Sequence, residues 1–352
     1  MFFLQDGFCR NARAFAGVFF LATALPGLGG CALVIPQTEE LRTAWPAQLP
    51  ERIEIAGVPF FPQDEFQCGP AALATSLAHF KVPVKPEDLV SKVYLPARRG
   101  SLQIEMLAAT RTYGLVPYKL ASRFEDMLHE VATGTPVIVL QDYGVWPVSI
   151  WHYAVVIGYD RKKGEVLLRS GVKNRLTIPF AVFEYTWKES EYWALVTTPP
   201  DRVPATAAEK PYLEAVVAMG RVGPPDAVRS AYTALLRRWP GNLTAGIGLA
   251  NRHYAAGDLA AAETVLRSTA SHHPDAVVVI NNLAQTLSDR GKNDEALDLI
   301  EPVLARAGPL SADVRDTHTT ILKRLGRVPL ELKGDAMPGT PPADRAPPQG
   351  RN

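Results

Sequence analysis

The sequence predicts an α+β domain followed by an all-α domain of helical repeats. In the first 200 residues, apolar segments at helical spacing come first and β-branched, strand-like segments come second, an order typical of α+β domains. From about residue 206 the sequence turns helical and repeats with a period of 34 residues. The length of 352 residues suits two domains of ordinary size.

Composition and charge exclude several classes of function. The net charge is +1, from 37 basic and 36 acidic residues, so bulk electrostatics gives no reason to expect nucleic acid as a partner. The three cysteines, Cys9, Cys31 and Cys68, have neither a disulfide-framework pattern nor zinc spacing. The histidines also lack ligand spacing, and no phosphate-binding glycine loop is present. We therefore expect no metal and no cofactor.

Residues 1–30 have the pattern of a signal peptide. Arg10 and Arg13 precede an apolar run over residues 14–25, which is too short to span a hydrocarbon core of about 30 Å as a stable helix. The sequence then reads Pro-Gly-Leu-Gly-Gly before Cys31, with a leucine at −3 and small residues at −2 and −1. This pattern resembles the lipobox of bacterial lipoproteins.

The lipobox resemblance implies an anchor and a location. It implies that Cys31 is lipidated and that the protein is held on a membrane by its acyl chains. The residue after the cysteine is Ala32 and not aspartate, which in this resemblance implies the outer membrane, with the folded chain facing the periplasm. Residues 31–50 are polar and punctuated by proline, and we expect them to be a tether.

Residues 51–200 form the predicted α+β domain. A short strand is expected within 53–61, and strands of an antiparallel sheet are expected over 136–140, 152–159 and 165–169. Helices are expected over 71–80, from 86, over 101–113 with Ser101 as its N-cap, and over 122–131.

Residues 206–328 form the predicted repeat domain. Gly223, Gly257 and Gly291 are spaced by 34 residues, as are Pro240 and Pro274. This period, with helix–turn–helix content, resembles the tetratricopeptide repeat. The two best repeats cover 243–276 and 277–310, with a weaker one before them. Residues 329–352 are rich in proline, glycine and alanine, and we expect a disordered tail.

The segment around Cys68 carries the candidate chemistry. Cys68 opens the helix expected over 71–80, where unpaired N–H groups and the helix dipole favour a thiolate. The side-chain amide of Gln63, five residues earlier, could join the backbone N–H of Cys68 in an oxyanion hole. The base must come from elsewhere in the chain, and His152, which opens the next strand, is the candidate.

These segments resemble a known family. Gln63 with the following Cys68-Gly-Pro-Ala-Ala-Leu, and the strand His152-Tyr-Ala-Val-Val-Ile-Gly-Tyr-Asp, are similar to the bacteriocin-processing cysteine peptidases and their stand-alone relatives. The resemblance covers roughly residues 53–197 and implies a papain-like fold that cuts peptides after a double-glycine leader. By position it makes Cys68 the nucleophile, His152 the base and Gln63 an oxyanion donor.

The chain departs from the family pattern at the residue that orients the histidine. The family has an aspartate about eighteen residues after the histidine, where this chain has Arg169-Ser170-Gly171. Ser170 or Asn174 is the candidate to orient His152, and a neutral group can serve in this role. The family's spacing from glutamine to cysteine is also commonly one residue longer.

Three functional hypotheses follow. The first is a membrane-anchored cysteine peptidase that forms a Cys68 thioester, with the repeats recruiting a substrate or a protein partner. The second is a weak or inactive peptidase-like scaffold in envelope assembly, which the missing aspartate favours. The third is a related Cys–His amidase acting on peptidoglycan or an amide conjugate.

Overall fold

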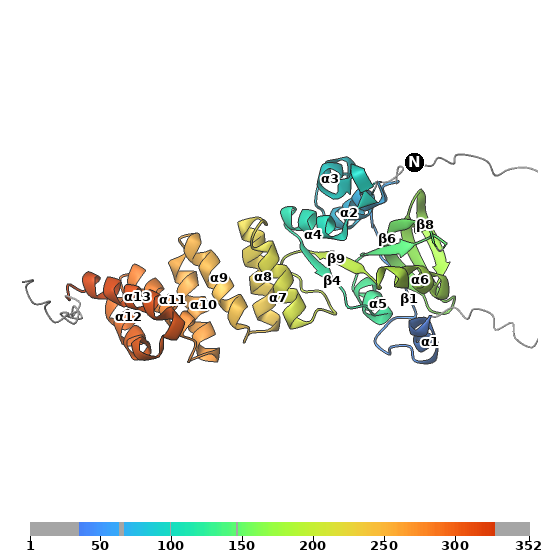
Figure 1. Ribbon diagram of the computed structural model, residues 1–352. Coiled ribbons are helices and arrows are strands. Elements are labelled where there is room, and N and C mark those ends of the chain that lie inside the picture. The colour runs from blue at the N-terminus through green and yellow to red at the C-terminus, as the bar shows by residue number, and fades with distance from the viewer. Residues whose placement is uncertain (1–34, 63–66, 99, 146, 328–352) are drawn as a thin grey trace, which may run out of the picture. The chain divides into compact units, whose positions relative to one another are not determined.

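The computed structural model describes residues 35–62, 67–98, 100–145 and 147–327 (Figure 1). The predicted signal peptide, the predicted lipidation site Cys31 and the predicted tail over 329–352 lie outside these residues. Within the described part, no helix combines the length and the hydrophobicity that crossing a membrane requires.

The first domain is built on a seven-stranded antiparallel sheet. Its strand order is β4-β9-β5-β6-β7-β8, and β1 pairs with β6 outside this path. The strands are β1 (Arg52–Glu54), β4 (Val116–Lys119), β5 (Val137–Asp142), β6 (Trp151–Asp160), β7 (Glu165–Ser170), β8 (Lys173–Pro179) and β9 (Ala194–Thr198). A separate two-stranded ladder joins β2 (Tyr94–Leu95) and β3 (Gly100–Ser101). The strands predicted over 136–140, 152–159 and 165–169 are β5, β6 and β7.

Helices cover both sides of this sheet (Figure 1). One group consists of α2 (Cys68–His79), α3 (Pro86–Val93) and α4 (Gln103–Thr112). The other group consists of α1 (Pro36–Thr43), α5 (Phe124–Ala132) and α6 (Phe180–Trp187). Short 3-10 turns cover Pro96–Arg98 and Lys188–Ser190. Helix α2 is the most deeply placed, because nine consecutive residues from Gly69 to Leu77 are buried. A helix that is apolar or small on every side can be enclosed in this way.

The predicted tether over 31–50 is wrong from residue 35 onward. Helix α1 lies in that range, and the Glu184 carboxylate accepts the backbone N–H groups of Gln37 at 3.0 Å and Thr38 at 2.6 Å. These donors have no partner within the first turn of a helix, and a carboxylate there also complements the helix dipole. Leu41 and Leu49 are buried, so the segment packs on the domain. Glu184 is remote in sequence, which is why composition alone suggested a free segment.

The second region consists of paired helices, as predicted. They are α7 (Glu209–Met219), α8 (Pro225–Arg238), α9 (Leu243–Ala255), α10 (Leu259–His272), α11 (Val277–Asp289), α12 (Asn293–Ile300) and α13 (Ser311–Arg324), with 3-10 turns over Glu301–Arg306 and Gly308–Leu310. Gly257 and Gly291 stand between paired helices with φ of +77° and +79°, a conformation that favours glycine. Gly223 is not in this conformation; it is crowded by Met219 instead.

The first helix pair shares its apolar core with the sheet domain. Tyr212 of α7 packs near Tyr118 of β4 with ring centroids 6.0 Å apart, and the Tyr118 hydroxyl accepts the Ala208 N–H at 3.1 Å. The core that contains β5 and β6 continues through Val216 and Leu235, whereas α11 to α13 enclose a second core. Burial of this apolar surface stabilises the junction.

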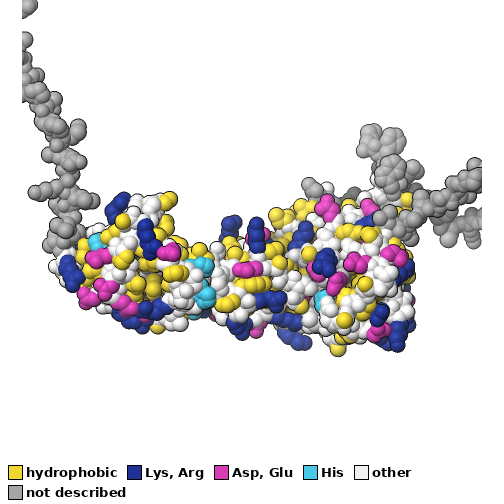
Figure 2. Space-filling model, turned by 90° about the horizontal axis from the view of Figure 1, so that it is seen from below, with side chains coloured by type: hydrophobic (Ala, Val, Ile, Leu, Met, Phe, Trp, Pro, Cys, Tyr) yellow, Lys and Arg dark blue, Asp and Glu magenta, His cyan; other side chains and the backbone are white. Residues whose placement is uncertain are grey.

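Charged side chains of both signs are intermixed over the face of the molecule that Figure 2 shows. No extended basic stripe appears on this face, which agrees with the net charge of +1. The surface therefore lacks, on this side, the electrostatic pattern typical of nucleic-acid-binding proteins.

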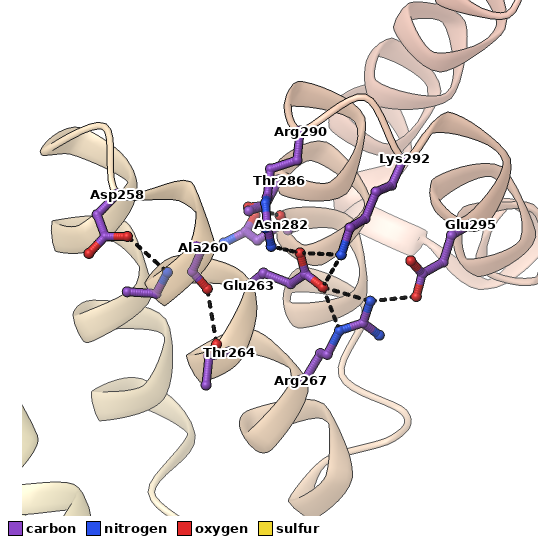
Figure 3. A network of polar contacts seen from close by, with 11 residues as sticks. Asp258, Ala260, Glu263, Thr264, Arg267, Asn282, Thr286, Arg290, Lys292 and Glu295 are labelled. Carbon is purple, nitrogen blue, oxygen red and sulfur yellow. Dashed lines mark hydrogen bonds and ion pairs between the residues drawn. The ribbon is translucent and has the colours of Figure 1, made fainter.

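A buried glutamate joins two neighbouring repeats (Figure 3). Glu263 of α10 is only 6% exposed, and its carboxylate contacts Arg267 on its own helix and both Arg290 and Lys292 in the turn between α11 and α12. Burial alone would raise the pKa of Glu263. Hydrogen bonds from Lys292 and Arg267 outweigh that effect and lower the pKa to about 2. Arg267 also contacts Glu295 of α12, which extends the network.

Replacing Glu263 with glutamine should destabilise the repeat region at neutral pH. The difference between 4.5 and about 2 corresponds to about 3 kcal/mol, at about 1.4 kcal/mol per pH unit. Because the folded-state pKa is depressed, this stabilisation is present above pH 4.5 and is lost as the pH falls toward 2. Urea unfolding followed by circular dichroism should therefore give a large difference between parent and variant at pH 7 and a small one near pH 2. Asp275→Asn is the control, because the Asp275–Arg306 pair is exposed and should contribute well under 1 kcal/mol. Equal losses in both variants would contradict the prediction.

Candidate active site around Cys68 and His152

Close packing against β3 fixes the start of α2. A Cβ on Gly69 would lie 2.2 Å from Ser101 Oγ and 2.4 Å from Ser101 Cβ, so only glycine fits. Ser101 is therefore not the N-cap that its sequence position suggested. Helix α4 begins at Gln103 with Leu102 as N-cap, because Ser101 pairs with Tyr94 in the β2–β3 ladder.

Cys68 is the first residue of α2, and its thiol is free and partly buried. Burial raises the pKa of this thiol, and the backbone N–H groups of Tyr153 and Gly69 oppose the rise without cancelling it. The position at a helix N-terminus therefore does not by itself produce a thiolate here. The thiol remains protonated at neutral pH and needs a base to become a nucleophile.

His152 lies in β6, directly before the residue whose N–H points at the Cys68 thiol. Its Nε2 is 2.9 Å from Ser170 Oγ, which leaves Nδ1 as the nitrogen available for a second partner. Burial lowers the pKa of His152 to about 4, so the imidazole is neutral at pH 7. A neutral imidazole can accept a proton, which is the property that a general base requires.

The structure separates the two candidates for the orienting residue. Ser170, at the end of β7, is buried and contacts His152. Asn174, in β8, is exposed, and its backbone carbonyl accepts a hydrogen bond from Arg169. Gln63, which the sequence analysis names as the candidate oxyanion donor, lies outside the described residues.

Tyr143 is a neighbour of His152 that the sequence did not indicate. Its ring stacks on the imidazole, with centroids 5.3 Å apart and planes at 26°. The Tyr143 hydroxyl donates to Gln141 Oε1 at 3.0 Å, and Gln141 Nε2 donates to Thr186 Oγ1 of α6 at 2.7 Å. Tyr143 as a whole is 41% exposed, but partial removal of its hydroxyl from water raises its pKa, while a hydrogen bond from Ser170 opposes the rise. The tyrosine therefore restrains both the imidazole and the serine.

The signal that could have revealed Tyr143 is strand register. Gln141 pairs directly with His152 across β5 and β6, and the pairing continues to Tyr143, just after β5, so Tyr143 is on the face of the imidazole. That register depends on the loop between the strands and could not be read from the residue pattern alone.

The arrangement brings together a thiol, a neutral imidazole and hydroxyls that hold the imidazole. It has the parts for nucleophilic attack assisted by a general base. Among the described residues, no group of three or more histidine, cysteine, aspartate or glutamate side chains is placed to hold a metal ion.

Replacing Gly69 with alanine should destabilise the domain by about 1–3 kcal/mol, the usual cost of overpacking a buried site. Thermal unfolding measures the loss. The double variant Gly69→Ala/Ser101→Gly removes both Ser101 atoms that the new methyl group would meet, and should recover most of the stability. A single variant as stable as the parent would show that α2 and β3 are not in close contact.

Two family models match this chain. Residues 55–194 match the model of the Peptidase_C39 like family, and residues 253–316 match that of the tetratricopeptide repeat. No curated protein matches the chain. Among solved structures, a C39-like peptidase from Bacillus anthracis is 19% identical, with a TM-score of 0.36, covering 42% of this chain and 98% of its own. A double glycine motif protease from an AMS/PCAT transporter, solved with the leader peptide, is 23% identical, with a TM-score of 0.32, covering 41% and 93%. On the two family matches, the chain contains a C39-like peptidase domain followed by tetratricopeptide repeats.

Proposed function

We propose that this chain is a cysteine peptidase in which the Cys68 thiol attacks the peptide bond and Nδ1 of His152 is the general base. The observation that carries the proposal is the meeting of α2 with β6. The Cys68 thiol receives the N–H of Tyr153, the residue after His152, and the far nitrogen of His152 is held by Ser170. The match of residues 55–194 to a peptidase family supports the same reaction.

The proposed reaction starts from a neutral pair. As the Cys68 sulfur bonds to the substrate carbonyl carbon, the thiol proton passes to Nδ1 of His152, and the carbonyl electrons move to the oxygen. The N–H of Cys68 and the amide of Gln63 are the proposed donors to that oxyanion. Collapse of the intermediate breaks the C–N bond, and the imidazolium gives its proton to the leaving amine. Water, deprotonated by His152, then hydrolyses the thioester and releases the thiol.

In this mechanism Ser170 and Tyr143 are positioning residues. Nε2–H of His152 donates to Ser170 Oγ, which fixes the tautomer that leaves Nδ1 free to accept a proton. Stacking of Tyr143 limits rotation of the ring. A hydroxyl stabilises the imidazolium less than a carboxylate would. The free-energy cost of transferring the thiol proton to His152 is therefore higher here than it would be with a carboxylate at Ser170.

The location and the role of the repeats are part of the proposal. The lipobox-like sequence that ends at Cys31 supports a lipid anchor, with the chain on the periplasmic side of a bacterial outer membrane. The paired helices support recruitment of a substrate or a protein partner. The second candidate, a peptide-binding scaffold, is favoured by one observation: a hydroxyl contacts His152 where the related peptidases have a carboxylate.

Replacing Cys68 with alanine should abolish cleavage of unfolded protein substrates and labelling by a peptidyl epoxide, with a loss of at least about a thousandfold in rate. Mass spectrometry of the labelled peptide distinguishes Cys68 from the other cysteines. His152→Ala is the companion variant, because it keeps the thiol but removes the base. Cleavage by Cys68→Ala at the parental rate would exclude the proposed nucleophile. Absence of cleavage and labelling in the parent chain would favour the scaffold.

Replacing Ser170 with aspartate should raise the pKa of His152 by about 1–3 units, because a carboxylate beside Nε2 stabilises the imidazolium. The base must be neutral to act, so the activity of the parent should fall as the pH drops through about 4. In the variant this acid limb should move to higher pH, and alkylation of Cys68 at pH 7 should be faster. Asn174→Asp adds the same charge at an exposed neighbouring position and should leave the acid limb in place. A shift in Asn174→Asp alone would make Asn174 the orienting residue.

A further inference from the structure

Exposed apolar side chains are concentrated at one end of the sheet. Among the described residues, eleven large apolar side chains are exposed, and seven of these lie on segments next to Cys68, His152 or Ser170. We name these seven the apolar rim: Ile104, Tyr143, Val145, Val148, Ile150, Trp151 and Val172. Solvent-exposed apolar clusters of this kind usually mark binding sites.

Most of the apolar rim lies on the hairpin that joins β5 to β6. Val145 is 83% exposed, Val148 is 64% exposed and Ile150 is 57% exposed. The hairpin leads directly into the base, because Trp151, 49% exposed, is the residue before His152. Tyr143, at the other side of the hairpin, stacks on the imidazole.

The hairpin is held in shape by its own hydrogen bonds. Asp142 Oδ1 accepts the N–H groups of Gly144 at 2.8 Å and Ile150 at 2.7 Å, and the Tyr143 N–H donates to the Ile150 carbonyl at 2.9 Å. A Cβ on Gly144 would lie 1.9 Å from the Val148 carbonyl oxygen, so the two arms are in close contact. The hydrogen-bonded hairpin therefore holds Val145 and Val148 in solvent-exposed positions.

The other two members of the apolar rim come from separate segments. Val172 is in the turn between β7 and β8, two residues after Ser170, which contacts His152. Ile104 is in the first turn of α4, three residues after Ser101, which packs on Gly69 beside Cys68. The apolar rim therefore includes residues on segments that adjoin the proposed base, His152, and a residue on a segment that adjoins the proposed nucleophile, Cys68.

The chemistry of the hairpin favours uncharged ligands. Residues 143–151 contain no charged side chain, and the carboxylate of Asp142 is directed into the hairpin's own backbone. A charged substrate side chain resting here would lose water and find no partner, which is unfavourable. A bulky aliphatic or aromatic side chain would instead bury apolar surface.

We propose that the apolar rim is the substrate-binding surface of this site, and that it selects polypeptide segments with bulky apolar side chains next to the scissile bond, a preference that differs from the double-glycine cleavage implied by the sequence resemblance. This rests on the proposed peptidase function. A polypeptide is favoured over a lipid surface because the rim is distributed over three segments that adjoin the reacting groups. A peptide bond that reaches Cys68 must bring its flanking side chains to these segments.

The test uses the full chain and two quenched fluorescent decapeptides of equal length, one with Leu and Phe around its centre and one with Ser and Glu. The parent should cleave the apolar peptide with the higher kcat/KM. Val148→Ser/Ile150→Ser should lower kcat/KM for the apolar peptide by at least about tenfold, as expected for loss of one buried aliphatic side chain. The control Val222→Ser removes an exposed valine from the turn between α7 and α8, outside the sheet domain, and should cleave like the parent.

Binding without catalysis separates this proposal from the proposed function. The Cys68→Ala chain should bind the apolar peptide in a fluorescence anisotropy titration, and adding the two serine substitutions should weaken binding by a similar factor, whether or not the parent cleaves. Alkylation of Cys68 by iodoacetamide in Val148→Ser/Ile150→Ser should stay at the parental rate, because the thiol and imidazole are unchanged. Equal binding of both peptides, or binding unaffected by the hairpin substitutions, would overturn the proposal. A second result would also overturn the proposal: the parent cosediments with phosphatidylethanolamine–phosphatidylglycerol vesicles, and the hairpin variant loses this cosedimentation but still binds the peptide.

Discussion

The contact between helix α2 and strand β6 is the constraint on which the candidate site depends. Small residues allow α2 to be enclosed along most of its length, and Gly69 lets its first turn lie against Ser101. That close approach places the Cys68 thiol at the N–H of Tyr153, beside His152. The nucleophile is therefore positioned by packing of small side chains, and a single added methyl group would move it.

The same burial sets the electrostatics of the pair. Removing the thiol and the imidazole from water disfavours the charged form of each, which raises the pKa of Cys68 and lowers that of His152. A carboxylate at the position of Ser170 would offset this by stabilising the imidazolium. With a hydroxyl there, the resting site holds no net charge. The uncharged pair and the apolar rim have the same preference, because neither offers a charged partner to a charged group of the ligand.

Local patterns in the sequence predicted most helices and strands. Features that depend on contacts between distant residues could not be predicted from these patterns. The segment from Cys68 to His79, the strand that begins near His152 and the 34-residue period with Gly257 and Gly291 all have short-range signals, and the structure has the corresponding helix, strand and turns. The exposed strand β8 and the four-residue β4 have weak alternation, and neither was predicted. Ser101 resembled an N-cap until its pairing with Tyr94 was known. Tyr143 could be found only from the register that puts Gln141 opposite His152.

Buried carboxylates stabilise the joints of this chain. Three glutamates are buried among the described residues, and each connects segments that are distant in sequence. Glu184 binds the start of α1, and Glu263 holds neighbouring repeats together. Glu130 accepts both the backbone N–H and the hydroxyl of Thr206, where the chain leaves the sheet domain. Both oxygens of Glu184 and of Glu263 accept hydrogen bonds, as burial of a charge requires, whereas in Glu130 only Oε1 does and Oε2 is buried without a partner. Acid should therefore weaken the contacts of Glu263 as the pH falls toward 2 and this carboxylate becomes protonated. In the folded chain the imidazole of His152, with a pKa of about 4, should gain its proton at a higher pH than Glu263, with a pKa of about 2.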